Sequence, residues 1–421
     1  MEVEMSKHKT REELDCWNSN RKGTKFEGVA TSKNEKMDED KNEKKKNEEG
    51  FVNKEQLKNK EEMQKYLNNN SSGIMEKFEL INYIDSGGES HVYGINIKTE
   101  DKNGKIHRKK AILKAIVKHK RENDNKRQIF ISNKLKNKNI IDLYGFTKLK
   151  DQTYLLFMEN AKYGHLRNFE RKIIKRPNLS ESMLCFFANQ ILTAIAYCHK
   201  CKVAHLDIKP QNIVIDEYLN AKLIDFSISL NYEGKKNNDP IVLPCRGTNF
   251  YLAKEVLESK KIKIKDLNKV DLYSFGVVLY NLAFSRYPHN LTHGDEDNYE
   301  EILRKIKNNK IEFDRGYSPY FIDFLNQLLK RDINERIDIN GALNHYWIKG
   351  AQLLLEEKEK ICNASIFTSY LMTDYIPSFN DYIDKHKHQK IIEKIPYQEN
   401  ICVEKRQKFN KNKENPLKMC R

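Results

Sequence analysis

Four side chains with distinct chemistry lie close together in the sequence. Asp207, Lys209 and Asn212 fall within one short run, and Asp225 follows thirteen residues after Asn212. A carboxylate such as Asp207 can orient a hydroxyl group and accept its proton. Lys209 adds a positive charge beside it, and the oxygens of Asn212 and Asp225 are hard ligands of the kind that Mg²⁺ prefers. This set of groups suits a reaction in which negative charge must be neutralised while a hydroxyl attacks.

The two segments that carry these groups resemble known motifs. His205-Leu206-Asp207-Ile208-Lys209-Pro210-Gln211-Asn212 is similar to the catalytic loop of eukaryotic protein kinases, and Asp225-Phe226-Ser227 is similar to their metal-binding motif. Phosphoryl transfer requires such residues because the enzyme mainly positions the reactants and neutralises charge. Taken singly, each aspartate is an ordinary turn or strand-end carboxylate, but an eight-residue match argues against that interpretation. The resemblance implies that the catalytic residues are Asp207 and Lys209, and that the Mg²⁺ ligands are Asn212 and Asp225.

Segments earlier in the chain resemble the nucleotide-binding motifs of the same family. The run 85–92 is similar to the glycine-rich loop, in which small residues let backbone N–H groups approach phosphates. Ile112-Leu113-Lys114 resembles the lysine motif of the third strand, and the run 156–161 resembles the hinge, with Met158 as gatekeeper. The resemblance implies an ATP site formed by Gly87, Gly88, Ser90, Val92, Lys114, Met158, Glu159, Ala161 and Val214.

Motifs after the catalytic loop extend the resemblance to residues 76–350. The run 247–255 is similar to the end of the activation segment, and 271–276 to the buried helix whose aspartate supports the catalytic loop. Aminoglycoside- and choline-type kinases are not expected to share these two segments. Lys209-Pro210 resembles the serine/threonine pattern. The structural and regulatory positions that the resemblance implies are Gln128, His205, Phe226, Thr248, Glu255, Asp271 and Arg336, with Arg336 placed to pair with Glu255.

Some positions depart from the common pattern of the family. These are Asp85 and Ser90 in place of glycines, Ile112 in place of alanine, Leu206 in place of arginine, Ser227 in place of glycine and Lys254 in place of proline. The helix glutamate that would pair with Lys114 is replaced by Gln128, with Glu122 as the alternative on another helix face. Gln can donate a hydrogen bond but lacks the charge that strengthens one.

The activation segment contains few hydroxyl groups. Between Leu230 and Gly247 there is no Ser or Thr, and Tyr232 is the one tyrosine. Leu206 stands where the family usually has the arginine that clamps an activation-loop phosphate. Both observations lead us to expect that activation-loop phosphorylation is not needed.

The elements that must position these residues follow from hydrophobic periodicity. The pattern predicts an α+β protein with a small lobe of five strands and one helix followed by a larger, mainly helical part. The resemblance implies that these form the N-lobe and C-lobe of the bilobal protein-kinase fold. The expected N-lobe elements are strands near 78–80, 93–97, 111–117, 143–148 and 154–158, a polar hairpin loop at 98–110 and a helix at 121–136. A helix through Cys198, short strands at 213–215 and 222–224, an irregular stretch at 228–253 and helices from Asp271 to Trp347 are expected in the C-lobe.

Composition divides the chain into four parts. Residues 1–75 contain 16 Lys and Arg against 16 Asp and Glu with little apolar periodicity, so we expect a disordered or loosely helical extension. Residues 76–161 form the predicted N-lobe and hinge, and 162–350 the predicted C-lobe. Residues 351–421 are expected to be partly helical; the run 366–383 is apolar enough to dock on the kinase body or a partner in a regulatory role, or else the extension is a disordered spacer.

Charge and cysteine content bear on partners and location. Residues 76–350 hold 47 Lys and Arg against 34 Asp and Glu, which favours acidic substrates or phosphates or simply keeps the domain soluble. Eight scattered cysteines fit a reducing compartment, and the run 198–201 resembles half a zinc site without a matching second half. Without a secretory signal or a spanning segment, a cytoplasmic protein is expected, and Lys44-Lys45-Lys46 leaves the nucleus open.

Two classes of function remain after this comparison. The first is an ATP- and Mg²⁺-dependent serine/threonine kinase that acts on protein substrates, with no nucleic acid or membrane partner expected. The alternative is a pseudokinase or scaffold that binds nucleotide without efficient transfer, which Asp85, Ile112 and Gln128 favour. ATP binding without phosphoryl transfer would distinguish the second from the first.

Overall fold

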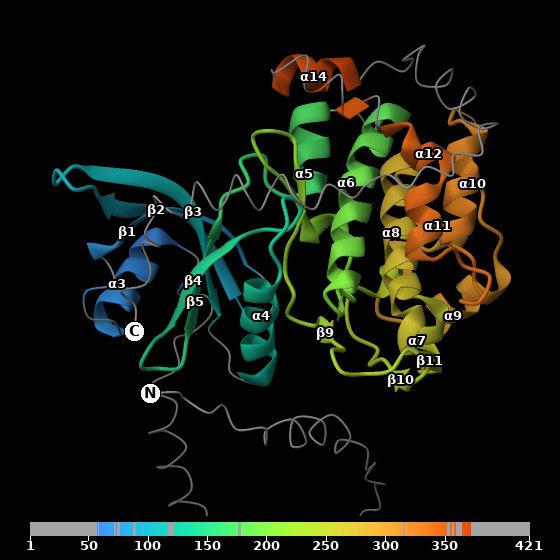
Figure 1. The fold of residues 1–421 in the computed structure, drawn as a ribbon, viewed down its shortest axis with the longest axis horizontal. Coiled ribbons are helices and arrows are strands. Elements are labelled where there is room, and N and C mark those ends of the chain that lie inside the picture. The colour runs from blue at the N-terminus through green and yellow to red at the C-terminus, as the bar shows by residue number, and fades with distance from the viewer. Residues whose placement is uncertain are drawn as a thin grey trace, which may run out of the picture. The chain divides into compact units, whose positions relative to one another are not determined.

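The structure of this chain is a computed structural model. It describes residues 57, 59–70, 73, 76–86, 90–116, 122–175, 178–314, 316–351, 354, 355, 358 and 364–371. The fold is α+β: a five-stranded sheet with its helices forms one lobe, and helices dominate the other (Figure 1).

One antiparallel sheet contains the five N-lobe strands. They are β1 (Phe78–Ser86), β2 (Ser90–Glu100), β3 (Ile106–Ile116), β4 (Leu143–Lys148) and β5 (Tyr154–Glu159), in the spatial order β1-β2-β3-β5-β4. The polar hairpin loop expected at 98–110 is wrong in extent, because β2 and β3 remain paired as far as Glu100 and Ile106. This end of the hairpin is exposed on β3 from residue 106 to 110, so its strands show no alternation of apolar and polar residues.

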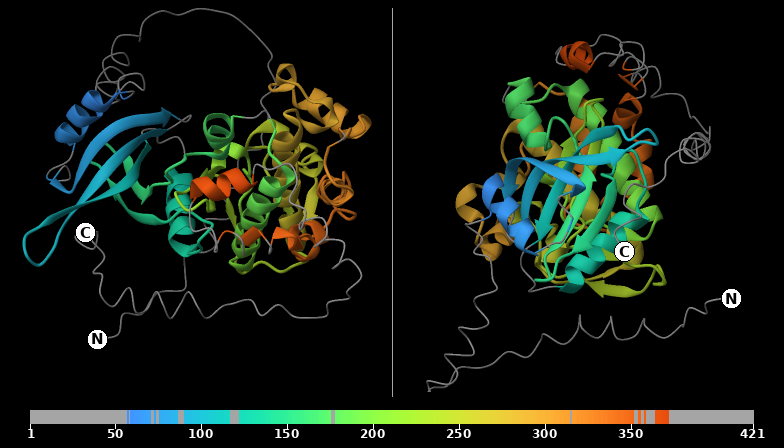
Figure 2. Two further views of the ribbon diagram at one scale, coloured as in Figure 1. Left: turned by 90° about the horizontal axis from the view of Figure 1, so that it is seen from above. Right: turned by 90° about the vertical axis from the view of Figure 1, so that its left-hand side faces the viewer.

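The helix α3 (Lys60–Asn70) covers one face of the sheet. Met63, Tyr66 and Leu67 are buried there in a cluster with residues of β1, β2, β3 and β5, among them Tyr93 and Leu113. Figures 1 and 2 show this blue helix beside the strands. Residues 60–70 thus differ from the disordered or loosely helical extension expected for 1–75. An eleven-residue helix is marginal in isolation, so burial against the sheet stabilises it.

The helix α4 (Glu122–Lys134) serves the opposite face of the sheet. Ile129 belongs to a small cluster with Ile116 of β3 and Leu156 of β5. Ile131 instead packs in the core of the helical lobe. The helix expected at 121–136 is therefore present, and its apolar residues contact both lobes.

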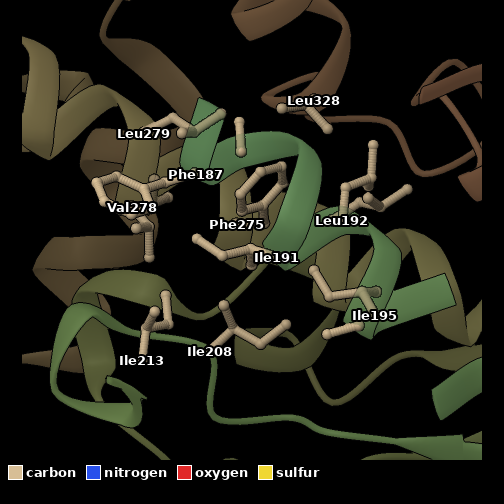
Figure 3. Close-up of a cluster of buried hydrophobic side chains, with 14 of the residues drawn as sticks. Phe187, Ile191, Leu192, Ile195, Ile208, Ile213, Phe275, Val278, Leu279 and Leu328 are labelled. Atoms are coloured by element: carbon tan, nitrogen blue, oxygen red, sulfur yellow. The ribbon is translucent and has the colours of Figure 1, made fainter. Parts of the chain in front are cut away.

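The core of the helical lobe lies around α6 (Glu181–Lys200) and α8 (Leu267–Phe284). Side chains such as Ile191, Phe275 and Leu328 meet in this core (Figure 3). The remaining helices are α5 (Leu166–Phe169), α7 (Lys254–Leu257), α9 (Tyr299–Asn308), α10 (Pro319–Leu328), α11 (Ile339–Asn344), α12 (Tyr346–Lys349) and α14 (Ala364–Leu371). The short strands are β6 (Val203–Ala204), β7 (Ile213–Ile215), β8 (Ala221–Leu223), β9 (Leu230–Asn231), β10 (Pro240–Val242) and β11 (Lys261–Lys263), paired as β6–β9, β7–β8 and β10–β11.

The helix α14 docks on the helical lobe. The ring of Phe367 is buried against Phe186 of α6, with 5.2 Å between the ring centroids. Ser180, which caps the start of α6, also donates a hydrogen bond from its hydroxyl to the carbonyl oxygen of Leu371. Part of the run expected to dock, 366–383, therefore contacts the kinase body, and residues 372–383 lie outside the described residues. In the part of the chain that the structure describes, no helix is long and apolar enough to cross a membrane.

Candidate active site

The catalytic loop between β6 and β7 is held by one buried carboxylate. Asp271 of α8 accepts hydrogen bonds from the backbone N–H of His205 at 2.9 Å and of Leu206 at 2.8 Å. Its oxygen also lies 2.7 Å from Nε2 of His199. Burial alone would raise the pKa of Asp271, but the bonds and charge of His199 outweigh burial and lower that pKa. Asp271 thus fixes the backbone immediately before Asp207.

The carboxylate of Asp207 is surrounded by donors. Its Oδ2 accepts from Nδ2 of Asn212 and lies beside Nζ of Lys209, both at 2.8 Å. Its Oδ1 accepts a longer bond, 3.3 Å, from the backbone N–H of Thr248. Nζ of Lys209 also donates to Oγ1 of Thr248 at 2.8 Å. The three residues predicted from the local motif therefore lie together, and Thr248 joins them from the end of the activation segment.

Gly247 is required at its position by this crowding. Its φ of +111° is one that L side chains rarely adopt, and an added Cβ would lie 3.3 Å from both Oδ1 of Asp207 and the carbonyl oxygen of Leu206. The absence of a side chain therefore lets the activation segment pass close to the Asp207 carboxylate.

Asp225 joins three segments that are far apart in the sequence. Its Oδ1 accepts from Nζ of Lys114 on β3 at 3.0 Å and from Nε2 of Gln128 on α4 at 3.3 Å. Partial burial opposes ionisation, but the Lys114 ammonium and hydrogen bonds from Lys114 and Ser227 lower the pKa of Asp225 to about 2. The structure directs Gln128 toward the site, and the side chain of the alternative, Glu122, lies outside the described residues.

Strand register brings the expected nucleotide-binding residues of the sheet to one face. Val92 is paired with Lys114, and Ile112 is paired with Met158. Because alternate residues of a strand share a face, these four side chains lie on the side of the sheet opposite Leu113 and α3. Ser90 is buried at the start of β2. Gly87 and Gly88, the backbone part of the expected phosphate cradle, lie outside the described residues.

The hinge is fixed by a pair that the sequence did not suggest. Oε1 of Glu159 lies 3.0 Å from Nζ of Lys222 on β8, and its Oε2 accepts from the backbone N–H of Asp142. Val214, the expected floor of the adenine pocket, lies on β7 opposite Lys222, and Ala161 follows the hinge strand. The pair therefore connects the hinge strand with the strands that follow the catalytic loop.

Further contacts hold the turn and the end of the activation segment. Nε2 of His205 lies 3.0 Å from the carbonyl oxygen of Ile224, and its ring lies 4.9 Å from that of Phe226. Arg336 forms two hydrogen bonds to the carboxylate of Glu255, at 2.7 and 3.1 Å, and both side chains are almost fully buried. The structure thus brings together the pair that the sequence predicted.

Tyr232 is an interior residue of the activation segment. Its hydroxyl donates to the carbonyl oxygen of His199 at 3.0 Å and lies 3.2 Å from Nδ1 of the same residue. Burial raises the pKa of Tyr232. His199, which the sequence pattern suggested only as half a zinc site, thus links Tyr232 to Asp271. Among the residues that the structure describes, no group of three or more His, Cys, Asp or Glu side chains could hold a metal ion by itself.

Comparison with known proteins identifies relatives of this chain. The model of the protein kinase domain matches residues 78–348. CBL-interacting protein kinase 11 of Oryza sativa subsp. japonica is 33% identical over 224 residues, which cover 53% of this chain and 42% of that protein. Maternal embryonic leucine zipper kinase of Danio rerio is 29% identical over 66% of this chain and 38% of that protein. Calcium-dependent protein kinase 5 of Plasmodium berghei is 30% identical over 82% of this chain and 56% of that protein. The chain therefore spans between about two fifths and somewhat over half of the length of these relatives.

Proposed function

Because this chain belongs to the protein kinase family, we propose that it transfers the γ-phosphate of ATP to serine or threonine hydroxyls of protein substrates. The observation that carries the proposal is the arrangement around Asp207. Its Oδ2 lies 2.8 Å from both Nζ of Lys209 and Nδ2 of Asn212. Lys114 and Asp225 lie in a second, connected cluster.

The donor set fits Mg²⁺ and the phosphates of ATP. Nδ2 of Asn212 donates to Asp207, which leaves the Oδ1 of this amide as an acceptor for a cation. Asp225, with a pKa of about 2, is an ionised hard ligand near neutral pH. Mg²⁺, when bound, neutralises charge on the phosphates. Lys114 would hold the phosphate oxygens, and Val92 and Met158 would line the adenine pocket.

The hydrogen bonds of Asp207 indicate which oxygen receives the substrate. Its Oδ2 already has two close donors, Asn212 and Lys209, whereas Oδ1 has only the 3.3 Å bond from Thr248 among its described contacts. A substrate hydroxyl would therefore donate to Oδ1, and that oxygen would accept its proton as the new oxygen–phosphorus bond forms and the bond from the γ-phosphorus to the departing ADP breaks. Lys209 would stay between Asp207 and Thr248, where its charge faces the transferred group.

Activity is proposed to be independent of activation-loop phosphorylation. Leu206 packs partly against the core of the helical lobe and offers no cation to a phosphate. Tyr232 places its hydroxyl in the interior. Phosphatase treatment should therefore leave the rate unchanged, and Tyr232→Phe should retain activity. Loss of activity in both experiments would contradict independence.

The decisive experiment is transfer of labelled γ-phosphate from MgATP to a generic acidic or basic protein. Asp207→Asn is expected to lower the rate by about 10²- to 10⁴-fold, because the proton acceptor is lost. Asp314→Asn is a matched control, since that side chain is 58% exposed and pairs with Arg286. Label on Ser or Thr that disappears in Asp207→Asn alone would support the proposal.

A scaffold function is the second candidate, because Gln128 occupies the α4 position that faces Asp225 and carries no charge. Measured ATP binding by the wild type without label on any substrate would favour the scaffold over the kinase. The same outcome would make Gln128→Glu the first variant to assay.

A further inference from the structure

The link between α4 and the metal-binding turn does not rest on Gln128 alone. The uncharged amide of Gln128 donates a hydrogen bond of 3.3 Å to the Asp225 carboxylate. The preceding residue, Arg127, donates from Nη2 to the carbonyl oxygen of Ser227 at 3.2 Å. Ser227 lies two residues after Asp225, in the same turn. Each of these bonds has one ionised partner, the guanidinium in one and the carboxylate in the other, so both are charge-assisted and Arg127 adds a second such bond between α4 and this turn.

A carboxylate of the same helix orients this arginine. Oδ1 of Asp124 accepts from Nη2 of Arg127 at 2.6 Å, across one turn of α4. Only 21% of the Arg127 side chain and 18% of the Asp124 side chain are exposed. Water therefore screens this pair less than it would a pair on the open surface.

Asp124 continues the connection to the activation segment. Its Oδ2 lies 3.6 Å from Nη1 of Arg246. Arg246 directly precedes Gly247, which lies so near the Asp207 carboxylate that an added Cβ would be 3.3 Å from Oδ1. The series Ser227–Arg127–Asp124–Arg246 therefore runs from the turn that carries Asp225 to the segment that touches Asp207.

We propose that Arg127 is a positioning residue for phosphoryl transfer: it holds the Asp225 turn against α4 in place of an ionic contact from position 128. Asp124 orients its guanidinium and shares charge with Arg246. This inference rests on the proposed kinase function for its effect on rate, whereas the contact itself is independent of that function.

An ordinary i,i+3 pair on a helix surface is the simpler interpretation, and two observations argue against it. The guanidinium has a second partner outside the helix, the Ser227 carbonyl, 100 residues away in sequence. In addition, Nε of Arg127 is buried without a hydrogen-bond partner among the described residues. A buried donor without a partner is unfavourable. The guanidinium is therefore oriented by the two hydrogen bonds of its terminal nitrogen and not by a bond to Nε.

The chain supplies a matched control for this arginine. Arg304 of α9 pairs with Glu301, also three residues earlier, at 2.6 and 2.7 Å, and 57% of its side chain is exposed. It has the same helix spacing without a third segment to hold. Arg127→Ala and Arg304→Ala therefore differ in the contact under test.

The test compares wild type, Arg127→Ala, Arg127→Lys and Arg304→Ala in the full chain. Arg127→Ala is expected to lower kcat by about 10- to 100-fold through displacement of the Asp225 turn, with KM for the protein substrate unchanged. Arg127→Lys, which keeps the charge, should recover part of the loss, and Arg304→Ala should stay within about two-fold of wild type. A kcat for Arg127→Ala as close to wild type as that of Arg304→Ala would overturn the proposal.

Amide hydrogen exchange of residues 225–229 separates this inference from the proposed function. Exchange should speed up in Arg127→Ala and not in Arg304→Ala, whether or not the wild type transfers phosphate. Equal exchange in both variants, or faster exchange spread over the whole chain, would reject Arg127 as a positioning residue. A wild type without transfer would reject the proposed function alone.

Discussion

The helices on the two faces of the N-lobe sheet differ in what they contact. The buried side chains of α3, Met63, Tyr66 and Leu67, all belong to one cluster with the sheet. Those of α4 are divided: Ile129 packs on the sheet and Ile131 packs in the core of the helical lobe. Polar side chains of α4 additionally reach the turn that carries Asp225 and the activation segment.

This difference separates stability from coupling. Each large apolar side chain that α3 buries contributes about 1.5–3 kcal/mol through apolar area removed from water, and these contacts hold one lobe together. The α4 contacts connect three parts of the fold, so a shift of α4 changes the position of Asp225 relative to Lys114. Changes to α3 should therefore alter stability without altering catalysis, whereas changes to the polar contacts of α4 should alter catalysis as well.

Truncation on α3 should give the largest effect on stability. Leu67→Ala removes a fully buried side chain and is expected to lower the free energy of unfolding by about 2–5 kcal/mol. Urea unfolding would measure this loss, with Asn68→Ala at the next, exposed position as the control. If kcat also fell well below the unfolding temperature, the proposed separation between α3 and the active site would be wrong.

A smaller loss is expected from a polar contact that links α3 to the loop before β5. The hydroxyl of Tyr66 donates to Oγ1 of Thr153 at 2.7 Å and also contacts Asp151. Tyr66→Phe keeps the ring but removes the hydroxyl from its bonds to Thr153 and Asp151, so about 1–3 kcal/mol of stability should be lost. Thermal unfolding would check this value, and a transition temperature equal to that of wild type would show that apolar burial alone docks α3.

On the face of the sheet that α4 covers, the effect of a substitution on the free energy of unfolding should depend on pH. The folded-state pKa of Asp225, about 2, lies below its ordinary value of 3.8, so its ionisation adds stability above about pH 4 that is lost as the pH falls toward 2. Lys114→Met removes the cation and raises this pKa. The difference in unfolding free energy between wild type and variant, measured with urea, should therefore be largest near pH 6 and shrink by pH 3. A difference independent of pH would mean that Lys114 does not stabilise the Asp225 carboxylate.

The outermost contact of α4 should matter least. Lys134 lies 2.9 Å from Glu233, but the Glu233 side chain is 64% exposed. Glu233→Gln should therefore cost less than about 1 kcal/mol, and high salt should remove the difference. A larger, salt-resistant loss would show that this pair also belongs to the buried connection between α4 and the activation segment.

Local motifs explain why much of the site could be predicted. Asp207, Lys209 and Asn212 are neighbours in the sequence, and their mutual contacts follow from one loop. The pairing of Glu255 with Arg336 and the support from Asp271 were also available, because each lies in a motif of its own. Counting back from Leu135 and residues 139–141 placed Gln128 at the position that pairs with Lys114. Its hydrogen bond in the structure goes to Asp225, which in turn accepts from Lys114.

Other contacts of the structure could not be predicted from the amino-acid sequence. The carbonyl oxygen of Ser227 accepts from Arg127 as a backbone atom, so no residue type marks it. Leu57, Met63 and Leu67 are too few in a Lys-, Glu- and Asn-rich region to stand out, and only the sheet gives them a place to pack. Such long-range contacts depend on tertiary structure, which overrides local composition.

The burial of Tyr232 makes this residue a gauge of how often the activation segment opens. Its backbone N–H donates to the carbonyl oxygen of Lys202, and β9, which ends just before it, pairs with β6. A reagent or enzyme that modifies phenols can reach the hydroxyl only in molecules where this short ladder has separated. When opening and closing are fast relative to modification, the rate of labelling is the intrinsic rate multiplied by the open fraction. The labelling rate of this one side chain thus measures the equilibrium between the closed and open forms of the segment around it.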